Sequence, residues 1–131
     1  MPYLRIFIGI KIHRGGVVDS ITLNDKQYGR SSGGVVESIT MEPDEIIEEI
    51  IYRKAVLVWI DSLCSMIIGT NFNTHVVSFP EWKIQTANYC GETLFSVRIP
   101  NNQNLASFFD TELEYNYDNW IIGFQNETVI S

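Results

Sequence analysis

The sequence predicts a single all-β domain that spans residues 1–131. The chain has the length of one domain, and 45% of its residues are apolar, which is enough for one core. Its apolar residues fall into short β-branched or aromatic runs, most of which end at Gly, Asn, Asp, Ser or Pro. One nine-residue segment also occurs twice, eighteen positions apart, which is the length of a hairpin unit.

Seven of the apolar runs are predicted to be strands. They are residues 5–12, 17–23, 35–41, 56–63, 76–79, 94–99 and 120–124. Many short strands, with no long helical pattern between them, are typical of a sandwich, a prism or a barrel.

One segment, residues 43–56, carries two conflicting signals. Ile46, Ile47, Ile50 and Ile51 lie at helical spacing, after a proline and acidic residues that suit a first helical turn. The same residues also alternate as they would in a strand with two faces. Local rules alone favour a helix here.

The repeated segment is GGVVDSITL at 15–23 and GGVVESITM at 33–41, and its two differences are conservative. A glycine pair before a strand permits a positive φ or a close approach of the backbone to another group. Two interpretations stay open: duplication of a stable turn and strand, or duplication of a binding loop.

Charge argues against several partners. The net charge of −7 repels phosphate backbones, and no basic stripe is present, so no nucleic acid is expected to bind. Anionic membrane surfaces are disfavoured too, and no apolar run approaches the ~20 residues that a membrane-spanning helix needs. Residues 1–12 lack the features of a signal peptide, so the expected location is cytoplasmic.

The sequence also lacks the motifs of enzymes and cofactor sites. His13 and His75 are far apart, with no His or Cys at ligand spacing, so neither a metal nor another cofactor is expected. Nucleotide-binding glycine loops and the serine elbow of hydrolases are missing. The acidic pairs at 44–45 and 48–49 are interpreted as a solvated edge, and no enzyme activity is expected.

Two features concern covalent modification. Cys64 and Cys90 are predicted to be half-buried thiols, in preference to a single bridge. Asn126-Glu127-Thr128 is an N-glycosylation sequon, which has a meaning only in a secreted protein.

Taken in order, several segments resemble the jacalin-related lectins. They are IGIKIHRGGVVDSITL, YGRSSGGVVESITMEPDEIIEEI and WIDSL with Thr70-Asn71 beyond it, which together cover roughly residues 6–71. CGETLFSVRIPNNQNL and YNYDNWIIGF are similar to the closing strands of that family. The resemblance implies a β-prism of three four-stranded antiparallel sheets with pseudo-threefold symmetry. It also implies a strand, in place of a helix, over residues 45–52.

The resemblance further implies that loops at one end of the prism bind sugar without metal. Such a site combines a carboxylate that accepts from adjacent hydroxyls, exposed amides of a glycine loop, and an aromatic ring. The carbohydrate-binding residues expected on this basis are Asp19 with Val17, Val18, Gly33 and Gly34; Asp61 with Trp59 and Ile60; and Asp118 with Tyr115, Asn116 and Tyr117.

The chain departs from the family pattern at several of these loops. Val17 stands where the family commonly has an aromatic, and the glycine loop that should serve Asp61 is reduced to Cys90-Gly91. The absent aromatic before Asp19 favours an alternative function, in which a β-prism has lost sugar binding and acts as a protein-interaction or structural domain, whereas the intact Gly33-Gly34 pair favours sugar binding. The expected partners are glycans or glycoproteins, with a homodimer as one source of avidity.

Overall fold

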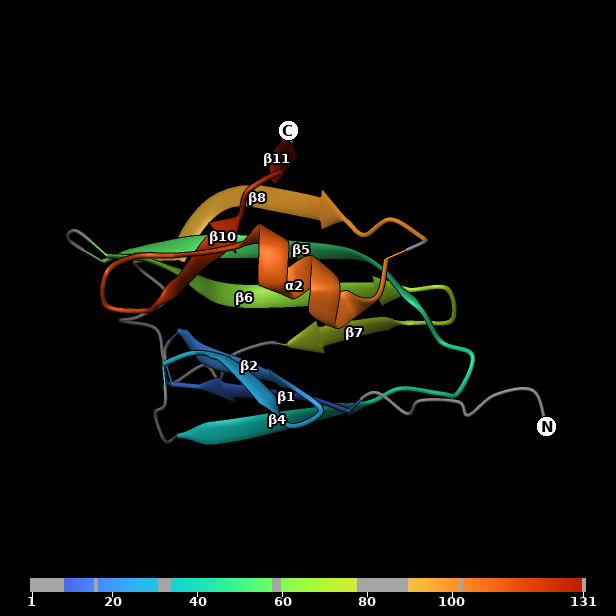
Figure 1. The fold of residues 1–131 in the computed structure, drawn as a ribbon. Coiled ribbons are helices and arrows are strands. Elements are labelled where there is room, and N and C mark those ends of the chain that lie inside the picture. Colours follow the sequence, from blue (N-terminus) through green and yellow to red (C-terminus); the bar gives the residue numbers. More distant parts are fainter. Residues whose placement is uncertain are drawn as a thin grey trace.

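The computed structural model describes residues 9–15, 17–30, 34–57, 60–77, 90–101 and 103–130. Over these residues the chain is built mainly of antiparallel strands, so the predicted all-β class is confirmed (Figure 1). The elements in chain order are β1 (Gly9–Arg14), β2 (Val18–Leu23), β3 (Lys26–Gly29), β4 (Val35–Thr40), β5 (Ile47–Leu57), β6 (Ile60–Thr70), β7 (Thr74–Val77), β8 (Cys90–Arg98), α2 (Leu105–Glu112), β9 (Leu113–Tyr115), β10 (Ile121–Phe124) and β11 (Thr128–Ile130).

The described strands form three sheets. A four-stranded sheet has the order β3-β2-β1-β4, a five-stranded sheet has the order β11-β8-β5-β6-β7, and β9 pairs with β10. Every pairing is antiparallel. The sheets of the described residues therefore contain four, five and two strands, where the resemblance implied four strands in each.

The two copies of the repeat are the two neighbours of β1. Arg14, the last residue of β1, pairs with Val18 of β2 on one side and with Val35 of β4 on the other. β2 lies between β1 and β3 and is almost wholly buried, whereas β4 lies at the edge of the described sheet and is largely exposed. Nearly identical sequences thus occupy two different environments.

The segment with conflicting signals is a strand. β5 pairs with β6 on one side and β8 on the other, and it buries Ile47, Ile50 and Tyr52. The helical signal was wrong because pairing along both edges of a central strand outweighs local propensity. The strand predicted at 56–63 was also wrong in its bounds, since it crosses from the end of β5 to the start of β6.

One helix, α2, was not predicted. The side chain of Asn104 caps its first turn by accepting from the N–H of Ser107 at 2.7 Å. Leu105, Phe108 and Phe109 lie on the buried face of the helix. Their spacing of three and four residues after a capping asparagine is a sequence signal for a helix.

A half-buried polar network fixes the turn between β10 and β11. The Tyr52 hydroxyl donates to the Glu127 carboxylate, which also accepts from Lys54 Nζ at 2.6 Å. The N–H of Phe124 donates to the Tyr52 oxygen at 3.3 Å and to Glu127 Oε1 at 3.2 Å. Burial and the bond to Glu127 both raise the pKa of Tyr52, so the phenol stays protonated as a donor.

Cys64 of β6 is fully buried and disulfide-bonded. The expectation of two free thiols was therefore wrong.

Candidate functional site

Several strand connections gather at one end of the molecule, on the left of Figure 1. β1 ends there and β2 begins there, β4 and β6 start there, and the connection from β9 to β10 reaches the same end. We call this region the loop end and define it as residues 14, 15, 17–19, 29, 30, 34 and 115–121.

Asp19 is the extra residue of a β-bulge at the loop end. Ser20 pairs with His13 and Val18 pairs with Arg14, which leaves Asp19 without a partner on β1. Bulges re-aim side chains and are common beside binding sites. Asp19 is 7% exposed, and its carbonyl oxygen accepts from the N–H of Arg30 at 2.9 Å.

The carboxylate of Asp19 forms no hydrogen bond or ion pair in the part of the chain that the structure describes. The other copy of the repeat behaves differently, because Glu37, at the position equivalent to Asp19, binds the guanidinium of Arg14. Of the two equivalent acids, one is thus committed to a structural ion pair. The other keeps its capacity to accept hydrogen bonds from a ligand.

Two glycines at the loop end pack closely against neighbouring main chain. Gly34 has φ +102°, and a Cβ there would lie 2.6 Å from the carbonyl oxygen of Arg14. Gly29 has φ +98°, and a Cβ there would lie 2.7 Å from the carbonyl oxygen of Asp19. Both positions therefore require glycine. The sequence had indicated this for Gly34, which belongs to the repeated glycine pair. Gly33, the other member of that pair, lies outside the described residues.

The connection between β9 and β10 is a structured loop. Asn116 Oδ1 accepts from the N–H of Asp118 at 2.9 Å and from the N–H of Trp120 at 3.1 Å. These bonds form the Asx turn that asparagine favours, and Asn119 completes the turn with φ +66°. The loop leaves Asp118 exposed and Tyr117 94% exposed.

Arg30 links this loop to the bulge. Its guanidinium lies 4.8 Å from the centre of the Trp120 ring, at the range of a cation–π interaction, while its N–H binds Asp19. Sequence reasoning did not identify Arg30 or Trp120 as part of this site. The available signal was an arginine directly after the Tyr-Gly turn, which points to no function by itself.

The other expected residues are placed as follows. Val17 and Val18 are buried, so their side chains belong to the interior. Tyr115 lies in β9 opposite Ile121, and partial burial raises the pKa of its phenol. Trp59 is outside the described residues, and Ile60 and Asp61 begin β6 with side chains that are also outside them.

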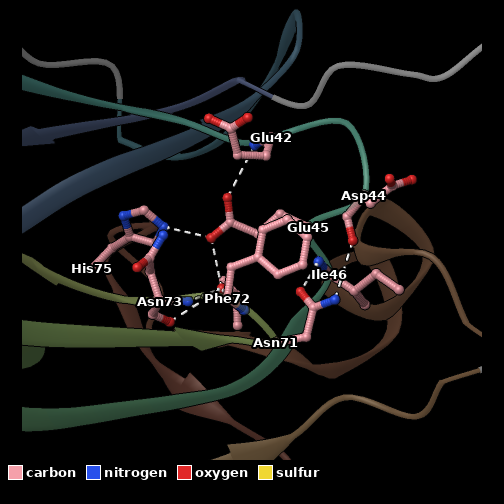
Figure 2. Close-up of polar contacts among 9 residues, drawn as sticks. Glu42, Asp44, Glu45, Ile46, Asn71, Phe72, Asn73 and His75 are labelled. Atoms are coloured by element: carbon pink, nitrogen blue, oxygen red, sulfur yellow. Dashed lines mark hydrogen bonds and ion pairs between the residues drawn. The ribbon is translucent and has the colours of Figure 1, made fainter.

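A second polar cluster lies where the β4–β5 connection meets the β6–β7 turn (Figure 2). The side chain of Glu45 is 1% exposed and accepts from Thr70 Oγ1 at 2.6 Å and from His75 Nε2 at 2.8 Å. It also accepts from the N–H of Glu42 at 3.0 Å. The interpretation of residue 45 as part of a solvated edge was therefore wrong, because Glu45 joins two chain segments.

Asn71 adds to this connection by pairing with the main chain beside Glu45. Its Oδ1 accepts from the N–H of Ile46 at 2.8 Å, and its Nδ2 donates to the carbonyl of Asp44 at 3.1 Å. Every polar atom of the cluster named here has a partner inside the protein. We interpret the cluster as structural.

The Glu45 cluster predicts a loss of stability in acid. Burial alone would raise the pKa of Glu45, but the hydrogen bonds from Thr70, the Glu42 main chain and His75 lower it below the ordinary value of 4.5. A lowered pKa in the folded state stabilises the protein above pH 4.5, and this contribution is lost as the pH falls through the lowered value.

Glu45→Gln should therefore cost about 1–3 kcal/mol near neutral pH, and its deficit relative to wild type should shrink as the solution is acidified below pH 4.5. Urea unfolding at a series of pH values measures both effects. Glu48→Gln, at an exposed neighbour, is the matched control and should follow the wild-type profile. A deficit for Glu45→Gln that is constant with pH would contradict this account.

The described residues contain no group of three or more His, Cys, Asp and Glu that could hold a metal ion. Within the same residues, no helix is long and apolar enough to cross a membrane. No protein-family model matches the sequence, and no curated protein is significantly similar to it.

Proposed function

We propose that the loop end binds carbohydrate and that the protein is a non-enzymatic glycan-binding domain of the jacalin-related, β-prism type. The observation that carries the proposal is the state of Asp19. This acid occupies a bulge, is fixed through its main chain by Arg30, and has a carboxylate without partners among the described residues.

The surroundings of Asp19 supply the chemistry that a sugar needs. A carboxylate can accept short, charge-assisted bonds from two adjacent hydroxyls of a pyranose. Gly34 exposes main chain without a Cβ, and the exposed ring of Tyr117 offers an apolar surface. An open polar site of this kind binds weakly, so several sites or a homodimer would provide useful avidity.

The strand pattern supports the β-prism as the finer description of the fold. The repeat places two equivalent strands on either side of β1, and the described strands divide into three sheets. We propose that β9 and β10 represent the third sheet of the prism. The helix α2, which the family pattern does not include, would then cover the place of its missing strands.

A glycan array followed by titration of the best ligand tests the proposal. Asp19→Asn keeps the size of the side chain but removes the charged acceptor, and it should weaken binding by about tenfold to a hundredfold. Asp25→Asn is the matched control, since Asp25 is exposed in the turn at the other end of β2. The control should bind like wild type.

A second candidate function is protein binding without sugar recognition. It is favoured by Val35 and Val36, which are 44% and 47% exposed on β4, beside the loop end. An array on which the folded protein binds no glycan would refute the first proposal and leave this one. Equal binding by Asp19→Asn and wild type would show that sugars bind elsewhere.

A further inference from the structure

The sequon Asn126-Glu127-Thr128 is the only Asn-x-Ser/Thr sequence in the chain. It lies in the turn between β10 and β11, where Asn126 and Thr128 are both exposed. β11 has three residues, all of them exposed, and pairs with β8 through only three residue pairs. The acceptor asparagine is thus at the surface, beside a short, exposed strand at the edge of its sheet.

A second, independent observation concerns the compartment. Cys64 is disulfide-bonded, and structural disulfides persist in the secretory pathway and outside the cell but are rare in the reducing cytosol. N-linked glycans are added in the same pathway. A buried, oxidised cysteine and an exposed sequon therefore point to one environment, which is not the cytoplasm expected from the sequence.

We propose that the chain folds in the secretory pathway and carries an N-linked glycan on Asn126. In the transfer, Asn126 Nδ2 forms a bond to C1 of the first sugar and loses a proton. The bond between that C1 and the diphosphate of a lipid-linked oligosaccharide breaks, and the lipid diphosphate leaves. No oxidation or reduction takes place. The proposal does not depend on sugar binding at the loop end.

The fold can accept this modification. Asn126 Nδ2 donates to Glu112 Oε1 at 2.7 Å, and the modified amide keeps one N–H that can make the same bond. β10 separates Asn126 from Trp120, so the glycan would be attached at the opposite end of that strand from the loop end. The glycan would then leave Asp19 uncovered.

The test is translation of the full chain, behind a cleavable export signal, in the presence of endoplasmic-reticulum microsomes. A protease added outside the microsomes degrades chain that has not been imported. The protected, imported protein is then recovered and digested with a peptide N-glycosidase. We expect one glycosidase-sensitive shift in gel mobility, with Asp found at position 126 after digestion. Asn126→Gln and Thr128→Ala should abolish the shift, and Thr128→Ser, which preserves the sequon, should retain it.

Imported wild-type chain that migrates identically with and without the glycosidase would overturn the proposal. A shift that persists in Asn126→Gln would overturn it as well, because the glycan would then be elsewhere. Labelling of free thiols in the imported chain supplies the second readout. If Cys64 reacts as a free thiol in the folded, imported protein, the disulfide does not form in the secretory pathway. That result would refute the proposal that the chain folds there.

Discussion

Replacing Phe124 with alanine is expected to lower the free energy of unfolding by about 3–5 kcal/mol. Phe124 of β10 is 0% exposed, and its ring centre lies 5.6 Å from that of Tyr52, 5.8 Å from that of Phe108 and 5.7 Å from that of Phe109. The ring therefore packs β10 against β5 of the five-stranded sheet and against α2. Its removal leaves a cavity among these three elements.

Chemical denaturation of wild type and Phe124→Ala measures this loss. Val129→Ala is the matched control, because Val129 is a 62% exposed residue of a nearby strand and its truncation should change stability by less than about 0.5 kcal/mol. A loss below about 1 kcal/mol for Phe124→Ala would show that the ring is not at the centre of the core.

Breaking the disulfide of Cys64 should be nearly as costly, at about 2–4 kcal/mol. A disulfide stabilises the fold mainly because it lowers the conformational entropy of the unfolded chain. Cys64 is also wholly buried, so its replacement must preserve an apolar side chain. Cys64→Ala satisfies that requirement.

A reductant distinguishes the stability that the disulfide contributes from the stability that the packing of the Cys64 side chain contributes. Adding dithiothreitol should lower the stability of wild type toward that of Cys64→Ala and should leave the variant unchanged. Unfolding curves recorded with and without the reductant give both comparisons. Wild-type stability that is insensitive to a reductant able to reach the unfolded chain would contradict a stabilising disulfide.

The all-β class of the fold could be predicted because it depends on local sequence patterns. Short β-branched runs with turn residues between them favour strands, and the strands predicted at 17–23 and 35–41 are β2 and β4 of the structure. The secondary structure of β5 could not be predicted in this way, because its isoleucines fit both the helical and the strand period. Pairing with β6 and β8 makes the segment a strand, and pairing between distant segments is not visible in a local pattern.

The missed helix has a different cause. Asn104, Leu105, Phe108 and Phe109 carry a complete capping and spacing signal. The helix lies largely between the two segments that resemble the closing strands of the lectin family, and the local rules apply to it without any knowledge of the family.

The geometry of the candidate site could not be predicted from the sequence. The resemblance suggested Asp19 as a site residue, yet only the register of β1 with β2 shows that this residue is the extra one of a bulge. The repeat also makes Glu37 look equivalent, and only the fold shows that Arg14 binds Glu37. The burial of Glu45 was hidden for the same reason, because Thr70 and His75 are far from it in the sequence.

Chemical-shift mapping with the best glycan ligand tests most directly whether ligands bind at the loop end. Upon titration, the amide signals of Asp19, Gly34 and Asn119 and the indole N–H of Trp120 should shift, while the signals of Thr70, Asn71 and His75 stay in place. Shifts concentrated around Glu45 and the β6–β7 turn, with none at Asp19, would contradict the proposed site.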